Sequence, residues 1–159
     1  MVVEATIEIP MGTKNKYEID TKSGRVKLDR VLYSSVSYPA EYGFIDKTLA
    51  GDGDALDILV LSSSPTFPGC IIDARVLGYL DIIDKGKEDA KVIAVVDKDP
   101  RFAHLNEIND VPSHTKEEIK EFFKTYKALQ NITVDIHDFH GLDKTKELIA
   151  KCQRNYSSK

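Results

Sequence analysis

The sequence predicts a mainly β protein with some helix, in which a small closed or partly closed β-barrel has helices packed on its outside. Two observations predict the strands: short apolar runs fill the first hundred positions, and clusters of turn residues separate them. A third observation is that helical periodicity begins only in the last third of the chain. Strands first and helices last, with glycines at bends, are typical of such a barrel.

The first predicted strands form a hairpin. Residues 6–10 alternate as a strand does, and residues 16–20 follow after a turn that contains Gly and Asn. Residues 21–24 form a second turn, so residues 25–32 return beside the preceding strand. Residues 57–61 are continuously apolar after their first position, which predicts a short buried strand.

A longer pair of strands comes next. Residues 69–84 are rich in β-branched residues, and Gly78 in their middle predicts a bend or bulge. The polar residues 85–88 predict a turn, and residues 91–96 then pair back onto this long strand.

The last third of the chain predicts two helices. The first has apolar residues at helical spacing, namely Ile119, Phe122, Phe123, Tyr126 and Leu129. Thr115 with Glu118 resembles a capping box at its start. A second helix is expected after Asp143, with a buried stripe of Leu148, Ile149 and Cys152.

Composition limits the classes of protein. A chain of 159 residues corresponds to one domain, here residues 1–159, with enough length for a core that needs no disulfide. The net charge of −4 and the lack of a basic block argue against nucleic acid as a partner. Two distant cysteines, no signal peptide and no bilayer-length apolar run predict a cytoplasmic protein without a membrane partner.

The most informative motif is the acidic segment at residues 51–57. Asp52, Asp54 and Asp57 stand within six positions, directly before the apolar strand. Carboxylates this close repel one another unless a counter-charge is present, and oxygen-rich clusters of this kind hold hard divalent cations. An acidic surface turn is the alternative, because Asp and Gly are ordinary turn residues.

Asp84 and Asp89 repeat the acidic pattern around the second hairpin turn. If a four-residue turn joins the strands, these two residues lie opposite each other, where like charges are destabilising. Lys91 projects from the same face as Asp89, since strand residues alternate. The pattern therefore predicts either a second cation site with a lysine for an anion, or a solvated hairpin tip.

Basic residues near the amino terminus fit an anionic ligand. Lys16 and Glu18 share one face of their strand, and Arg30 lies on the neighbouring strand. Arginine makes forked contacts with phosphate oxygens and lysine acts as a point charge, although ordinary surface ion pairs would look the same. Taken by itself, Tyr126 is a core tyrosine. About seven acidic and four basic residues near strand ends fit a multi-metal phosphoryl-transfer site.

These motifs closely resemble those of the soluble family I inorganic pyrophosphatases, from Glu4 to about Leu129. The central match is the run from Asp52 to Asp57, in which Ala55 stands where the family usually has proline. The other matching motifs are Ile7-Glu8-Ile9-Pro10, Lys16-Tyr17-Glu18, Asp29-Arg30, Tyr38-Pro39, Tyr42-Gly43, Asp84 with Asp89 and Lys91, Phe122-Phe123 and Tyr126-Lys127. The residues after Leu129 match weakly, and we expect no function from them.

The resemblance implies a five-stranded OB-type β-barrel with two or more helices outside it, and hydrolysis of inorganic diphosphate to two orthophosphates. It implies several Mg²⁺ ions per active site, with Mn²⁺ as a possible substitute, and a homo-oligomer, commonly a hexamer. The metal ligands it implies are Asp52, Asp57 and Asp89 for the first ion, Asp57 for a second, Asp84 and Asp89 for a third, Glu18 for a fourth, and Glu8 near the second through water. The phosphate-contacting residues it implies are Lys16, Arg30, Tyr42, Lys91, Tyr126 and Lys127.

The implied mechanism is direct attack of a metal-activated water on phosphorus, without a covalent phosphoenzyme. Asp54 matches the residue most often given the role of general base, and Asp89 is the competing candidate. We favour Asp54, because a carboxylate oxygen that is bound to a metal is a poorer base.

Other classes of site fit the sequence less well. An EF-hand loop would need Gly at its sixth position and Glu at its twelfth, where this chain has Asp57 and Ser63. A zinc site is disfavoured because all four histidines lie outside the acidic cluster. A non-catalytic OB-type module that binds oligonucleotides or sugars is the alternative from another class, since fold alone does not determine function.

Overall fold

The computed structural model describes residues 1–159. Four of the nine strands lie outside the main barrel, and three short 3-10 helices lie in the connections. The strands are β1 (Val2–Ile9), β2 (Asn15–Ile19), β3 (Val26–Val31), β4 (Glu41–Ile45), β5 (Asp57–Leu61), β6 (Ile71–Asp84), β7 (Lys87–Glu88), β8 (Lys91–Val96) and β9 (Val134–His140). The helices are η1 (Pro100–Phe102), η2 (Ile108–Asp110), α1 (Ser113–Thr125), η3 (Ala128–Gln130) and α2 (Leu142–Ser157).

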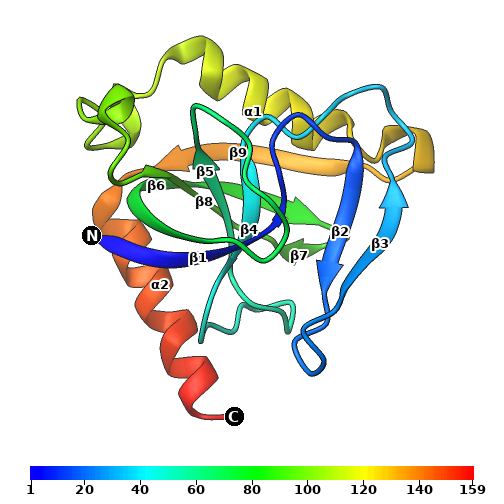
Figure 1. Cartoon of the computed structure of the whole chain (residues 1–159), viewed down its shortest axis with the longest axis horizontal. Helices are drawn as coiled ribbons and strands as arrows, with labels where there is room; N and C mark the ends of the chain where they lie inside the picture. The colour runs from blue at the N-terminus through cyan, green and yellow to red at the C-terminus, as the bar shows by residue number, and fades with distance from the viewer.

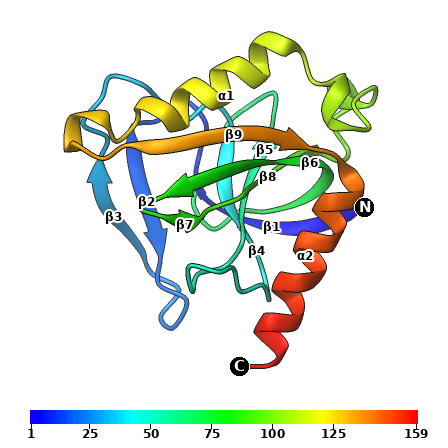
Figure 2. The same cartoon turned by 180° about the vertical axis from the view of Figure 1, so that it is seen from behind.

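Five strands close into a barrel, which confirms the predicted fold class. The order is β1-β4-β5-β8-β6, and β6 pairs back with β1 to complete the circle. All of these pairs are antiparallel except β5 with β8. The two long helices lie outside the strands (Figures 1 and 2), with α1 along β9 and α2 at the end away from the β2–β3 hairpin.

Each helix closes one of two buried clusters. Ile119, Phe122 and Phe123 of α1 pack with β-strand residues in the first cluster. Ile149 and Cys152 of α2 pack with the remaining strand residues in the second. Neighbouring residues of β5 and β8 alternate between the clusters, because successive side chains of a strand point to opposite faces. No helix is both long and apolar enough to cross a membrane.

The predicted strands agree with the structure, and three further strands were missed, of which β7 lies within the predicted turn at residues 85–88. β2, β3, β5, β6 and β8 lie where the sequence predicts them, and β1 extends further toward the amino terminus than expected. β4 was missed because its aromatic residues indicated only a core segment. β9 was missed because it is the edge strand beside β6, and its mixed polar sequence lacks regular alternation.

Two glycines stand where the backbone leaves no room for a side chain. A Cβ atom on Gly43 would lie 1.9 Å from the carbonyl oxygen of Thr6, so β1 and β4 can approach only at a glycine. A Cβ atom on Gly78 would lie 2.4 Å from the carbonyl oxygen of His140. The pairing of β6 with β8 shifts register at Gly78, which confirms the predicted bulge.

The helix predictions need three corrections. The capping box was wrong, because α1 already begins at Ser113 after Pro112, so Thr115 and Glu118 lie inside the helix. Leu129 lies in η3 and is 66% exposed, since the helical stripe ends with α1. α2 begins one residue before Asp143 and buries Ile149 and Cys152 as predicted, whereas Leu148 is only partly buried.

Glu41 is a buried carboxylate that the sequence did not reveal. Its side chain is 0% exposed and accepts hydrogen bonds from the backbone N–H groups of Met11 and Thr66, each at 3.1 Å, and from the Thr66 hydroxyl. It therefore fastens two loops to β4. These hydrogen bonds offset the free-energy cost of burying the polar carboxyl group of Glu41.

We expect Glu41→Ala to lower the free energy of unfolding by about 2 kcal/mol, because it leaves two backbone N–H groups without their acceptor. Urea unfolding followed by circular dichroism measures this change. Glu147→Ala, at an exposed position of α2, is the matched control and should change stability little. An equal loss in both variants would contradict the role given to Glu41.

Candidate active site

One pocket of about 530 Å³ gathers all thirteen predicted site residues. It lies between the β2–β3 hairpin, the ends of the barrel strands and the residues that follow α1. The acidic residues that line it are Glu8, Glu18, Asp52, Asp54, Asp57, Asp84 and Asp89. The other predicted residues that line it are Lys16, Arg30, Tyr42, Lys91, Tyr126 and Lys127.

Two of the acidic residues come from the connection between β4 and β5, which we call the acidic loop (residues 46–56). Asp52 accepts a hydrogen bond from the backbone N–H of Asp54 at 3.0 Å, so the loop turns tightly there. Gly53 between them has a φ of 96°, in the left-handed region that glycine adopts readily. Asp57 follows as the first residue of β5.

Lys91 forms the centre of the site. Its ammonium group donates to Asp57 at 2.6 Å, to Asp89 at 2.8 Å and to the Tyr42 hydroxyl at 2.9 Å, although the residue is only 2% exposed. Burial alone would lower the pKa of Lys91, but Asp57, Tyr42 and Asp89 outweigh it and hold that pKa well above its ordinary value. Lys91 is therefore a permanent cation in the pocket.

The Tyr42 hydroxyl completes this network by donating to Asp57 at 2.7 Å. Burial, with a further contribution from Asp57, raises the pKa of Tyr42 well above its ordinary value. The phenol therefore stays protonated and can donate a hydrogen bond in the pocket.

Asp84 and Lys127 form a second pair at the end of β6. The Lys127 ammonium donates to one oxygen of Asp84 at 2.6 Å, while the other oxygen of Asp84 is buried without a hydrogen-bond partner. The predicted placement of Asp84 opposite Asp89 was wrong. Asp84 pairs with Lys87 of β7, because the two residues of β7 shorten the turn, while the N–H of Asp89 bonds to Ile82.

The β2–β3 hairpin supplies the exposed side of the pocket. Lys16 and Arg30 lie on the two neighbouring strands that the sequence predicted, and the structure makes them register partners. Lys16 donates to Glu18 at 2.8 Å and to Asp29 at 3.3 Å, and Arg30 donates to Asp29 at 3.0 Å. Partly exposed pairs of this kind are weak, so both cations can turn toward an anion that enters the pocket.

Aromatic residues form the floor of the site. Tyr126 is buried and stacks on Phe122 with ring centroids 5.1 Å apart, while it also lines the pocket. The Lys91 ammonium lies 5.5 Å from the ring centres of Tyr42 and Phe123. Tyr126 is thus both a core residue and part of the site.

The donor set fits divalent cations of the hard class. Seven carboxylates face four basic side chains, a formal excess of three negative charges, and no thiol or imidazole lines the pocket. The unpartnered oxygen of Asp84 is a further acceptor with nothing to satisfy it. No three acidic side chains converge closely enough to enclose a cation as they stand, and Lys91 lies between Asp57 and Asp89 instead.

Burial, and after it the crowding of carboxylates, raises the pKa values of three acidic residues in the pocket. Burial raises the pKa of Glu8, and it raises that of Asp89 against the opposing effect of Lys91. Partial burial, and then the charges of Asp52 and Asp57, raise the pKa of Asp54. The Asp54 side chain is exposed and accepts no hydrogen bond from the protein, so it is open to take up a proton.

We expect Asp54→Asn to stabilise the protein at neutral pH when a chelator is present. Since the folded pKa is raised, stability is lost as pH rises from the ordinary aspartate value through the folded value, and Asn removes this loss. Solvent screening limits the gain to about 0.5 kcal/mol. Thermal unfolding at pH 7.5 and near pH 3.5 measures it. A gain that persists at the acidic pH would contradict this origin.

The pocket has lining residues that the sequence did not reveal, namely Ile19, Thr21 and Phe44. The backbone N–H of Ile19 donates to Glu8 at 2.8 Å, which ties the hairpin to the barrel. Period-two alternation placed Ile19 on the face opposite Glu18. The strand ends at Ile19, so alternation no longer decides which residues border the pocket.

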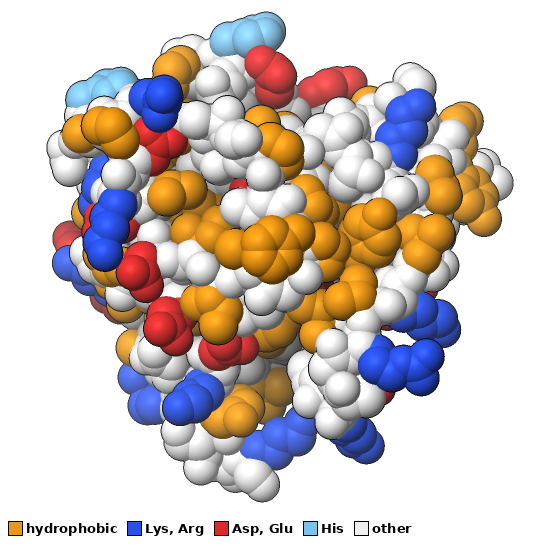
Figure 3. Space-filling view, in the orientation of Figure 1, with side chains coloured by type: hydrophobic (Ala, Val, Ile, Leu, Met, Phe, Trp, Pro, Cys, Tyr) orange, Lys and Arg blue, Asp and Glu red, His pale blue; other side chains and the backbone are white.

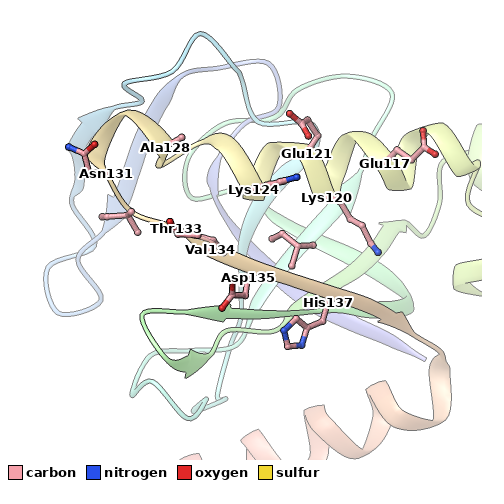
Figure 4. Close-up of a pocket in the computed structure, with 12 residues that line it drawn as sticks. Glu117, Lys120, Glu121, Lys124, Ala128, Asn131, Thr133, Val134, Asp135 and His137 are labelled. Carbon is pink, nitrogen blue, oxygen red and sulfur yellow. The ribbon is translucent and has the colours of Figure 1, made fainter.

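A second hollow, of about 1110 Å³, lies between α1 and β9 and contains none of the predicted residues (Figure 4). Its walls carry both signs of charge, from Glu117, Lys120 and Lys124 on the helix and Asp135 and His137 on the strand. It has no crowded carboxylates and no buried lysine. The chemistry of the chain is therefore concentrated in the acidic pocket, although the α1–β9 hollow is larger.

The comparisons with known proteins agree with this site. The family model of inorganic pyrophosphatase matches residues 5–157. The inorganic pyrophosphatase of Halalkalibacterium halodurans is 54% identical over 155 residues, covering 98% of this chain and 95% of the relative. That of Geobacillus stearothermophilus is 53% identical over 156 residues, covering 98% of this chain and 94% of the relative.

A solved structure shows the same fold. The crystal structure of inorganic pyrophosphatase from Thermus thermophilus superposes with a TM-score of 0.95 at 45% identity, covering 98% of this chain and 91% of that chain. The expected end of the resemblance near Leu129 was wrong, because the family match continues through β9 and α2. The residues after Leu129 contribute none of the thirteen site residues, so the motifs on which the resemblance was based end before them.

Proposed function

The chain belongs to the inorganic pyrophosphatase family, and from this premise we propose that it hydrolyses inorganic diphosphate to two orthophosphates in a Mg²⁺-dependent reaction. The proposed reaction is direct transfer of the phosphoryl group to water. No side chain of the chain needs to form a covalent intermediate.

The observation that carries the proposal is the charge of the pocket. Its formal excess of negative charge would repel a diphosphate anion, whereas four basic side chains and the Tyr42 hydroxyl are arranged to contact one. A pocket with this negative charge can bind a diphosphate anion only if divalent cations bind with it and neutralise the carboxylates. An acidic groove of this kind does not fit binding of nucleic acid.

The residues divide into three groups by role. We propose that Mg²⁺ is held by Glu8, Glu18, Asp52, Asp57, Asp84 and Asp89, with Glu8 acting through water. When bound, Mg²⁺ neutralises phosphate oxygens and lowers the pKa of an attacking water. Lys16, Arg30, Tyr42, Lys91, Tyr126 and Lys127 bind and orient the phosphate groups.

Asp54 is the proposed general base. Its carboxylate accepts no hydrogen bond from the protein, and partial burial followed by neighbouring charges raises its pKa, so it accepts a proton more readily than an ordinary aspartate. Asp89, in contrast, already accepts a hydrogen bond from Lys91 and is assigned to metal binding. The proton from the attacking water therefore passes to Asp54.

The test is release of orthophosphate from diphosphate by the purified protein at mildly alkaline pH. We expect rapid release with millimolar Mg²⁺ and none with a chelator, and Mn²⁺, which also accepts oxygen ligands, is tested as a substitute. A nucleic-acid shift at low salt is measured beside it. A folded protein that releases no phosphate and shifts an oligonucleotide would overturn the proposal in favour of a binding module.

We further propose a cytoplasmic homo-oligomer, most simply a hexamer. Hydrophobic side chains gather across the face seen in Figure 3, and the exposed large residues include Val26, Leu28, Val31, Phe67 and Ile71. Exposed apolar surface of this kind is typical of contacts between protein chains. Both cysteines are free thiols, as suits a reducing compartment. Light scattering after gel filtration measures the assembly, and a monomeric mass would contradict it.

A further inference from the structure

Hydrogen bonds hold the acidic loop at its base and, separately, within its tip. At the base, the Thr48 hydroxyl donates to the carbonyl of Ile45 at 2.6 Å and accepts from the N–H of Leu56 at 2.9 Å. At the tip, the N–H of Ala50 donates to the carbonyl of Asp54 at 2.7 Å, and the N–H of Gly53 donates to the carbonyl of Ala50 at 3.1 Å, so the tip is closed on itself but not tied to the barrel by these bonds. Between these two points the chain continues through Leu49.

Leu49 is held by the last turns of α2. Its N–H donates to the carbonyl of Cys152 at 2.9 Å, and its carbonyl accepts from the side-chain amide of Asn155 at 3.3 Å. Both backbone polar groups of Leu49 are therefore satisfied by a helix more than a hundred positions away in the sequence. In both cartoon views the acidic loop lies beside these turns (Figures 1 and 2).

The packing beneath the loop supports the same contact. Cys152 is buried in one cluster with Leu56, the last residue of the acidic loop, and Ala50 packs partly buried against that cluster. Asp52 is also close enough to raise the pKa of the Cys152 thiol, although burial is the larger cause. The end of α2 thus lies against the segment that carries Asp52 and Asp54.

The internal hydrogen bonds fix the shape of the tip, whereas the contact with α2 fixes its position relative to the barrel. Gly51 and Gly53 flank Asp52, and Ala55 follows Asp54 at a position where proline would restrict the backbone. Each hydrogen bond that holds the loop in place reduces the conformational entropy of Asp52 and Asp54 before a cation binds. Reducing that freedom in advance lowers the entropic cost of binding.

We propose that Asn155 is a positioning residue that fixes the acidic loop through Leu49 and thereby raises the affinity of the site for Mg²⁺. The proposal rests on the proposed function, since it assigns the acidic loop to metal binding. It gives α2, in which the sequence indicated no function, a part in the active site.

The test compares Asn155→Ala with Gln153→Ala, an exposed neighbour on the same helix whose side chain makes no hydrogen bond with the loop. Alanine is a better helix former than asparagine, so α2 is not weakened and global unfolding should stay unchanged. In metal-free protein, hydrogen exchange of the amides of residues 49–54 should be about fivefold faster in Asn155→Ala, the factor expected from one hydrogen bond.

Calorimetric titration with Mg²⁺, without substrate, is the second readout. The dissociation constant should rise about fivefold in Asn155→Ala and stay unchanged in Gln153→Ala. Faster exchange with unaltered Mg²⁺ affinity would overturn the positioning role and leave only a structural contact. Equal values for both variants in both experiments would overturn it as well. A wild type that binds Mg²⁺ but releases no phosphate would overturn the proposed function alone, because neither readout depends on turnover.

Discussion

Asp54→Asn is expected to lower the turnover of diphosphate by about a thousandfold at saturating Mg²⁺, within the range found for loss of a general base. Asparagine has nearly the same shape as aspartate but cannot take up the proton. Because Asp54 accepts no hydrogen bond from the protein, the substitution breaks no contact in the pocket. Steady-state phosphate release, together with Mg²⁺ titration by calorimetry, separates loss of the base from loss of metal.

Asp89→Asn is the matched comparison, since Asp89 is the competing candidate for the general base and the substitution again replaces a carboxylate by an amide. Asp89 accepts a hydrogen bond from Lys91 and is mostly buried, so its substitution should weaken Mg²⁺ binding. Its turnover at saturating Mg²⁺ should exceed that of Asp54→Asn. The assignment reverses if Asp54→Asn keeps near-normal turnover at alkaline pH while Asp89→Asn abolishes it, with metal binding intact in both.

The elements with a strong local pattern could be predicted from the sequence. The hairpin that carries Lys16 and Arg30 follows from period-two alternation, and the bulge at Gly78 follows from the position of a glycine, whereas the register of the hairpin was not predicted. The assignment of the thirteen residues to one active site depended on the resemblance to the family, not on local sequence patterns. Local patterns alone left acidic turns and surface ion pairs open at Asp52 and at Lys16.

Other features depend on contacts between distant segments and leave no local signal. Nothing in the sequence around Glu41 distinguishes it from an exposed glutamate, because the Met11 and Thr66 groups that donate hydrogen bonds to it come from distant segments. The relative position of Asp84 and Asp89 depended on a turn length that the two-residue strand β7 alters. The contact of Asn155 with Leu49 spans most of the chain, so no periodicity reports it.

Lys91→Met should produce the largest loss of stability in the chelated protein, about 3 to 5 kcal/mol. Methionine retains much of the side-chain volume but leaves Asp57 and Asp89 without their shared cation in a largely buried pocket. The pKa of Lys91 lies well above its ordinary value, so the partner that is lost is charged at every pH of interest. Urea unfolding in chelator measures the loss, and exposed Lys87→Met should show almost none.

Two further measurements separate charge from packing in Lys91→Met. Adding Asp89→Asn should restore part of the stability, because one of the two unpaired carboxylates disappears, and the double-mutant cycle gives the coupling. Millimolar Mg²⁺ should stabilise Lys91→Met more than it stabilises the wild type, since a cation then takes over the role of the ammonium group. Equal stabilisation of both proteins by Mg²⁺ would mean that Lys91 and the metal do not share these carboxylates, and the assignment of Asp57 and Asp89 as ligands would fail.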